Sequence, residues 1–78
     1  MGQYRHSVAT REKSIAGRPI IVERLVGEVA GTEEYAVEGL VALRNGAAEA
    51  HGATFAWASL SRFNSETHQW EEAKRLTN

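Results

Sequence analysis

The chain contains no cysteine and no aspartate, and its only proline is Pro19. Without cysteine, neither a disulfide nor a thiolate metal site can form. No apolar run approaches the ~20 residues that a membrane-spanning helix needs, and residues 1–13 lack the apolar segment of a secretory signal. These absences predict a cytoplasmic protein without a membrane partner.

The length and composition predict one globular domain covering residues 1–78. The chain is 42% hydrophobic and 24% charged, which is close to the average for globular proteins. A chain of this size buries only about 60–65% of the surface that its unfolded form exposes. We therefore expect marginal stability or self-association.

Groups that usually carry catalysis are scarce. The three histidines, His6, His51 and His68, do not lie at the i,i+4 spacing of a helical metal site, and HExxH is absent. No aspartate is available to orient a histidine, and GxSxG, GxGxxG and the GxxxxGK[ST] phosphate loop are also absent. The sequence therefore predicts a protein that is not an enzyme and that uses no metal or other cofactor.

Charge is distributed unevenly along the chain, although the net charge is only −1. Residues 1–24 hold five Arg and Lys against two Glu, a balance of +3, and residues 25–54 hold one Arg against five Glu, a balance of −4. Such a distribution indicates one basic and one acidic surface, which can steer a charged partner. A dispersed, solvated exterior is the alternative.

The first half of the chain predicts a β-hairpin. Residues 16–19, AGRP, form a turn signal, and residues 20–29 are rich in β-branched side chains. We expect residues 20–29 to form a strand that pairs antiparallel with residues 4–15.

Residues 31–52 predict a helix. Thr32 is placed as its N-cap, Glu33 and Glu34 lie in the first turn, and Gly52 ends it. Asn45-Gly46 is a weak point at which the helix could stop. One apolar stripe recurs at helical spacing, through Ala36, Leu40, Leu43, Ala47 and Ala50.

Residues 54–63 alternate strictly and predict a strand. The alternation places Phe55, Trp57 and Phe63 on one face. Because the predicted helix is rich in small residues, Phe55 and Trp57 are expected to supply the bulk of the core.

Residues 64–76 fit two structures. Asn64 followed by Ser65 and Glu66 favours a hairpin turn, whereas WEEAKRL is rich in helix formers and Ser65 could cap a helix. We prefer the hairpin, with Phe63 opposite His68 and Lys74 over the ring of Trp57.

The predicted fold is therefore α+β: a four-stranded, mainly antiparallel sheet with one helix, in the order β-β-α-β-β. The alternative order is β-β-α-β-α.

With no catalytic set, the sequence favours a non-catalytic protein-interaction module. A concrete version is a small stoichiometric inhibitor or regulator of a nucleic-acid-handling complex, of the kind that phages and mobile elements encode. Trp, Tyr and Arg are enriched in interface hot spots, and exposed acidic residues can mimic phosphate. The predicted partner-binding residues are Tyr4, Arg62, Phe63, His68 and Trp70 around the hairpin tip, and Glu33, Glu34 and Glu38 at the helix start.

Two alternatives remain open. A small DNA- or RNA-binding domain would use a basic N-terminal hairpin with Arg5, Arg11, Lys13 and Arg18, together with the aromatic residues, although the pI near 6.3 argues against it. A homo-oligomeric structural unit would form through an exposed edge strand.

Overall fold

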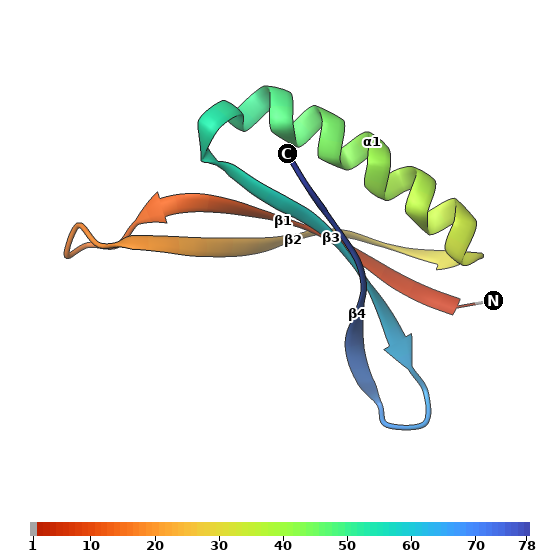
Figure 1. Ribbon diagram of the computed structural model, residues 1–78. Coiled ribbons are helices and arrows are strands. Elements are labelled where there is room, and N and C mark those ends of the chain that lie inside the picture. Colours follow the sequence, from red (N-terminus) through yellow and green to blue (C-terminus); the bar gives the residue numbers. More distant parts are fainter. Residues whose placement is uncertain (1) are drawn as a thin grey trace.

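The computed structural model describes residues 2–78, which form one sheet and one long helix (Figure 1). The elements in chain order are β1 (Gly2–Lys13), β2 (Pro19–Gly31), α1 (Glu33–His51), the 3-10 turn η1 (Gly52–Thr54), β3 (Phe55–Asn64) and β4 (Gln69–Thr77). The predicted α+β fold, with the order β-β-α-β-β, is confirmed. The alternative with a second helix is wrong, because residues 69–77 form a strand.

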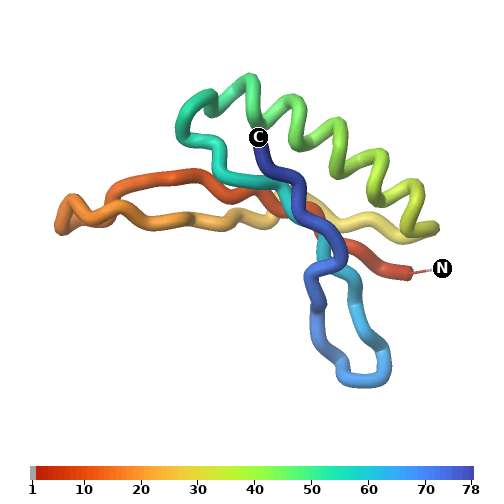
Figure 2. Tube along the Cα trace, viewed as in Figure 1, coloured from red at the N-terminus to blue at the C-terminus, as the bar shows by residue number. Residues whose placement is uncertain are grey.

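The sheet has the strand order β2-β1-β3-β4, and every neighbouring pair is antiparallel. Strands β2 and β3 therefore run parallel on either side of β1, and α1 crosses from one to the other. Figures 1 and 2 show α1 along one face of the sheet, while the β1–β2 and β3–β4 hairpins splay apart at their tips. No element of residues 2–78 covers the opposite face, which we call the open face.

The helix forms where its capping residues predict it. The hydroxyl of Thr32 accepts a hydrogen bond from the Tyr35 amide at 3.2 Å, and the amide of Gly52 donates to the Ala48 carbonyl. Gly52 has a φ of 56°, which a glycine adopts without steric cost. The helix runs through Asn45-Gly46 without interruption, so the predicted weak point does not end it.

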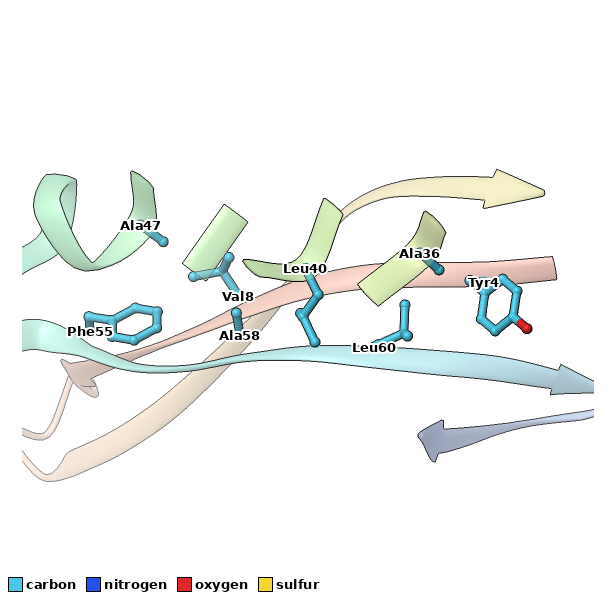
Figure 3. Packing of buried hydrophobic residues seen from close by; sticks show 8 residues of the cluster. All are labelled: Tyr4, Val8, Ala36, Leu40, Ala47, Phe55, Ala58 and Leu60. Atoms are coloured by element: carbon cyan, nitrogen blue, oxygen red, sulfur yellow. The ribbon is translucent and has the colours of Figure 1, made fainter. Parts of the chain in front are cut away.

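The core lies between α1 and the two central strands (Figure 3). Small residues of α1 allow the helix to lie close to the sheet, and Leu40, Phe55 and Leu60 are the largest side chains buried completely. Of the predicted helical stripe, Leu43 is only half-buried and Ala50 is exposed. The buried cluster consists of Tyr4, Val8, Ala36, Leu40, Ala47, Phe55, Ala58 and Leu60.

A β-bulge in β3 separates the two aromatic residues that were expected to share a face. Thr10 pairs with Phe55 while the preceding residue, Ala9, pairs with Trp57, so Ala56 is an extra residue in β3. Such an insertion reverses the alternation of side chains. Phe55 consequently joins the core, whereas Trp57 lies half-buried on the open face, and the prediction that Trp57 is a core residue is wrong.

The β3–β4 hairpin turns through four residues. The side-chain oxygen of Asn64 accepts hydrogen bonds from the amides of Glu66, at 2.9 Å, and Thr67, at 3.3 Å. His68 has a φ of 57°, the left-handed conformation that lets the chain return. Phe63 pairs with Trp70, not with His68 as predicted, because the turn contains two residues more than the predicted register allows.

Candidate interaction surface

The open face carries a belt of aromatic and charged side chains from all four strands. Trp57 crosses the central strand β1: both Trp57 and Glu23 are register partners of Ala9, and the indole Nε1 donates to Glu23 Oε2 at 3.1 Å. Ala9 is completely buried although no helix covers it. The ring of Trp57 thus covers Ala9 and shields this part of the open face from solvent.

Arginine side chains stack on both tryptophans. The Arg75 guanidinium lies 4.0 Å from the centre of the Trp57 ring, and Arg5 lies at the same distance from the Trp70 ring. The predicted cation over Trp57 was Lys74. A register irregularity between Leu60 and Ser61 places Arg75 on the open face instead. Guanidinium groups stack well on aromatic faces because they are planar and weakly hydrated.

Each stacked arginine is also held by a carboxylate. Arg5 Nε lies 2.6 Å from Glu28 Oε1, and Arg75 donates to Glu72 Oε1 at 2.9 Å. All four of these side chains are partly exposed, so the ion pairs add little stability by themselves. Their geometric effect is larger, since they restrict the guanidinium groups to positions over the rings.

The hairpin tip adds a second aromatic group. Phe63 and Trp70 face each other across the strand pair, with ring centres 5.3 Å apart and planes inclined by 59°. His68 meets the edge of Phe63 at 6.2 Å. The β3–β4 hairpin projects from the rest of the sheet (Figure 1), and these three residues lie in or beside its turn.

The five residues predicted around the hairpin tip do not form one patch. Phe63, His68 and Trp70 are together, but Tyr4 is only 5% exposed and belongs to the core under α1. Arg62 has its side chain on the helix-covered side, where it pairs with Glu33 at 2.5 Å.

Sequence reasoning missed Arg5, Arg75 and Glu23 as neighbours of the tryptophans. Strand alternation alone places a side chain on a face, but the bulges and registers decide which residues meet. The sequence indicates the face of only one of these residues. Arg5 is spaced by two from Ser7 and Ala9, and residues at that spacing lie on one face of a strand.

The acidic residues at the helix start differ from one another. Glu33 is neutralised by Arg62, while Glu34 and Glu38 are exposed. Of these three predicted partner-binding carboxylates, Glu34 and Glu38 are therefore the two that Arg62 does not neutralise.

The predicted basic residues of the first hairpin are also divided. Arg5 is engaged by Trp70 and Glu28, and Arg11 Nη1 donates to the Phe55 carbonyl at 2.6 Å. Lys13 and Arg18 lie near the exposed β1–β2 turn. The four cations thus do not form a continuous ribbon.

On the helix-covered side, Arg24 and Glu12 form a well-aligned pair near the β1–β2 turn. Arg24 Nη1 lies 2.5 Å from Glu12 Oε2, and the Thr10 hydroxyl donates to the same oxygen at 2.7 Å. Hydrogen bonds from Arg24 and then from Thr10 lower the pKa of Glu12 from 4.5 to about 2, and the carboxylate raises the pKa of Arg24. This pair is structural, because it fixes one strand to the next.

A shallow groove runs between α1 and the outer strand β2. Its volume is about 490 Å³, and most of its lining is apolar, with polar atoms from Thr10, Arg24 and His51. The apolar lining comes from Val8, Val26, Ala42, Leu43, Gly46, Ala47 and Ala50. The groove exists because α1 lies mainly over β3 and β1 and leaves β2 almost uncovered.

Within residues 2–78, the His and Glu side chains form no cluster of three or more that could hold a metal ion. The described chain also has no helix that is long and apolar enough to cross a membrane. Comparison of the chain with protein-family models, with curated proteins and with solved structures finds no match. The surface chemistry is therefore the basis for a functional proposal.

Proposed function

We propose that this protein is a non-catalytic protein-interaction module that binds a protein partner through its open face. The observation that carries the proposal is the pair of tryptophans held half-exposed on that face by stacked arginines. Trp and Arg dominate interface hot spots because they bury a large area and still offer directional hydrogen bonds.

The tryptophans are also ordered before any partner binds. Trp57 is fixed by Glu23 and Arg75, and Trp70 by Arg5 and Phe63. A side chain that is already fixed loses less conformational entropy on binding than a free one, which costs about 0.5–1.5 kcal/mol to immobilise. Preorganised rings on the open face favour a rigid, matching surface on the partner.

The charges indicate which chemistry such a partner presents. Arg5 with Glu28 and Arg75 with Glu72 place both signs around the rings. A protein surface with apolar side chains at its centre and both charges at its rim complements this arrangement. A polyanion does not, because each stacked arginine already has a carboxylate beside it.

A nucleic-acid-binding domain is the second candidate, since rings on an open antiparallel sheet can stack on unpaired bases. The narrower proposal of an inhibitor that mimics phosphate is supported by Glu34 and Glu38 alone, as Glu33 is paired. The open face therefore supports protein binding better than either of these.

Affinity capture from a native lysate tests the proposal with a matched pair of variants. Tyr35 is an aromatic residue that is 61% exposed on α1, away from the open face. We expect a partner protein that is retained at high salt and with Tyr35→Ala, and that is lost with Trp70→Ala. Retention of that partner by Trp70→Ala, or recovery of the protein alone at both low and high salt, would contradict the proposal.

A gel shift at two salt concentrations separates the second candidate. Phosphate contacts make affinity fall steeply with salt. A salt-sensitive complex with single-stranded DNA or RNA that is lost in Trp70→Ala would replace the protein-binding proposal.

A further inference from the structure

We propose that two copies of this chain join through the outer strand β2, which pairs antiparallel with β2 of the second copy about a two-fold axis. The proposal concerns a different surface from the open-face aromatics and does not depend on the partner that they bind. It follows from the aliphatic residues, charges and register of β2.

Exposed aliphatic residues concentrate on β2. Ile20 is 40% exposed, Ile21 47%, Leu25 57% and Val26 56%, so four of the seven large hydrophobic residues exposed in the described chain belong to this strand. Strand β2 also forms one edge of the sheet, so the outer side of its backbone has no partner strand. Such an edge is a template for another strand.

The charged side chains of β2 do not lie along this outer edge. Glu23 accepts a hydrogen bond from Trp57 on β3, Arg24 pairs with Glu12 on β1, and Glu28 pairs with Arg5 on β1. Each of the three charged side chains is thus drawn inward over the sheet. The outer edge is left with aliphatic side chains and backbone.

The opposite edge differs in its hydrophobic residues, although Arg75 there is also drawn inward, over Trp57. Strand β4 carries four charged residues among its nine, and none of the large exposed hydrophobic residues of the described chain lies on it. Charges on an edge strand are a common defence against pairing between molecules. The contrast indicates that β2, and not β4, is built to accept a strand.

One antiparallel register of β2 against itself pairs all four of its exposed aliphatic residues. With Glu23 at the two-fold axis, Ile21 lies opposite Leu25 of the second copy, and Ile20 lies beside its Val26, each contact occurring twice. Centring the axis on Val22 places Ile21 opposite Glu23 instead. Centring it on Arg24 places Glu23 opposite Leu25 and the two arginines against each other. Centring it on Ile21 joins Ile21 to Ile21 and Ile20 to Val22, but leaves Leu25 and Val26 beyond the start of the second strand. Only the Glu23 register pairs all four exposed aliphatic residues of β2 with one another.

A two-fold axis perpendicular to the sheet also determines where the helices, grooves and open faces of the two copies lie. Both α1 helices lie on one side of the resulting eight-stranded sheet, so their grooves of about 490 Å³ open toward each other. Ile20 of each copy then lies at the mouth of the groove lined by Val26 of the other. Both open faces lie on the opposite side and remain free.

Cross-linking between engineered cysteines tests this register directly, because the native chain has no cysteine. A disulfide requires Cα atoms within roughly 7 Å. In the proposed register Ile21 meets Leu25, whereas Ile21 lies four residues, about 13 Å, from the Ile21 of the second copy. A mixture of Ile21→Cys and Leu25→Cys chains is therefore expected to form mixed disulfide dimers under mild oxidation. Each variant alone is expected to form none. Equal cross-linking in the single-variant samples would overturn the register.

Sedimentation equilibrium over a range of concentrations tests the dimer itself. The matched pair is Leu25→Lys on β2 and Val41→Lys, an exposed aliphatic residue of α1 that does not line the groove. We expect the dissociation constant to rise at least about tenfold with Leu25→Lys, a loss of about 1.4 kcal/mol. It should not change with Val41→Lys. Circular dichroism at each concentration checks that both variants are folded.

Glu23→Gln provides a test in which association improves. The two Glu23 residues lie directly opposite each other at the axis, each carboxylate turned toward Trp57 of its own copy, and like charges on opposed residues are unfavourable. Glutamine removes the charge and keeps an acceptor for the Trp57 indole. We therefore expect the dissociation constant of the dimer to fall about two- to fivefold. A wild-type protein that stays monomeric at high concentration, or an unchanged dissociation constant in Glu23→Gln, would overturn the proposal.

Discussion

The indole nitrogen of Trp57 donates to the carboxylate of Glu23 at 3.1 Å, across the buried methyl group of Ala9. This contact joins β3 to β2 over the strand that separates them. No helix covers this face, so Trp57 and the stacked Arg75 shield the sheet from solvent there.

Replacing Trp57 is therefore expected to cost intermediate stability. We expect Trp57→Ala to lower the free energy of unfolding by about 1.5–3 kcal/mol, below the about 3–5 kcal/mol of a fully buried tryptophan. Trp57→Phe keeps most of the ring and loses the hydrogen bond, which is worth about 0.5–1.5 kcal/mol. Urea denaturation followed by circular dichroism measures both. A loss of 4 kcal/mol or more (about the full value for a core residue) in Trp57→Ala would contradict the half-buried position.

Trp70 has a smaller part in stability. Its contacts with Phe63 and Arg5 lie near the hairpin tip, and pairs of these kinds are each worth about 0.5–1.5 kcal/mol. We expect Trp70→Ala to cost about 1–2 kcal/mol in urea denaturation. Leu40→Ala, at a completely buried position, should cost about 2–5 kcal/mol. The ranking is wrong if the two variants lose equal stability.

Local signals in the sequence predicted the elements well. Thr32 and Gly52 bound the helix because a cap depends on hydrogen bonds within one turn. Asn64 predicted the β3–β4 turn for the same reason, since its side chain bonds to amides two and three residues later.

The faces of the sheet were harder to predict because they depend on contacts between strands. A single extra residue at Ala56 moved Trp57 from the predicted core to the open face. Nothing within residues 54–63 marks that position, because the alternation is unbroken there. The bulge lets Phe55 fill the space beside Ala47 and Ala58, a requirement that arises only once α1 packs on the sheet.

His68 adopts a left-handed conformation at some energetic cost. A non-glycine residue with positive φ loses roughly 1–2 kcal/mol, and the edge contact with Phe63 offsets part of this. We expect His68→Gly to raise the free energy of unfolding by about 0.5–1 kcal/mol, measured by thermal denaturation. His68→Ala is the control, since it loses the ring without gaining freedom at φ. Equal destabilisation by both would show that the ring contact outweighs the backbone strain.

Two glycines of α1 form a matched pair. A methyl group added at Gly46 would meet no atom within 4 Å, whereas one at Gly39 would lie 3.2 Å from Cε1 of His6. Alanine in a helix is favoured over glycine by about 0.5–1 kcal/mol. We therefore expect Gly46→Ala to stabilise the protein by that amount, and Gly39→Ala to give less or to destabilise it. A larger gain at Gly39 would contradict the close packing of His6 against α1, where His6 Nε2 lies 2.8 Å from the Ala36 carbonyl oxygen.

The Glu12–Arg24 pair predicts that the free energy of unfolding depends on pH. The pKa of Glu12 falls from 4.5 to about 2 in the folded chain because Arg24 and Thr10 donate hydrogen bonds to its carboxylate. A lowered folded-state pKa means that the unfolded chain binds the proton more readily. The contribution of Glu12 is thus fully present above pH 4.5 and is lost as the pH falls toward 2.

In urea denaturation at several pH values, Glu12→Gln should show a shallower loss of stability than wild type across this window. Glu66→Gln, at an exposed position in the β3–β4 turn, is the control and should follow the wild-type curve. Parallel curves for wild type and Glu12→Gln would show that the pair does not couple folding to protonation.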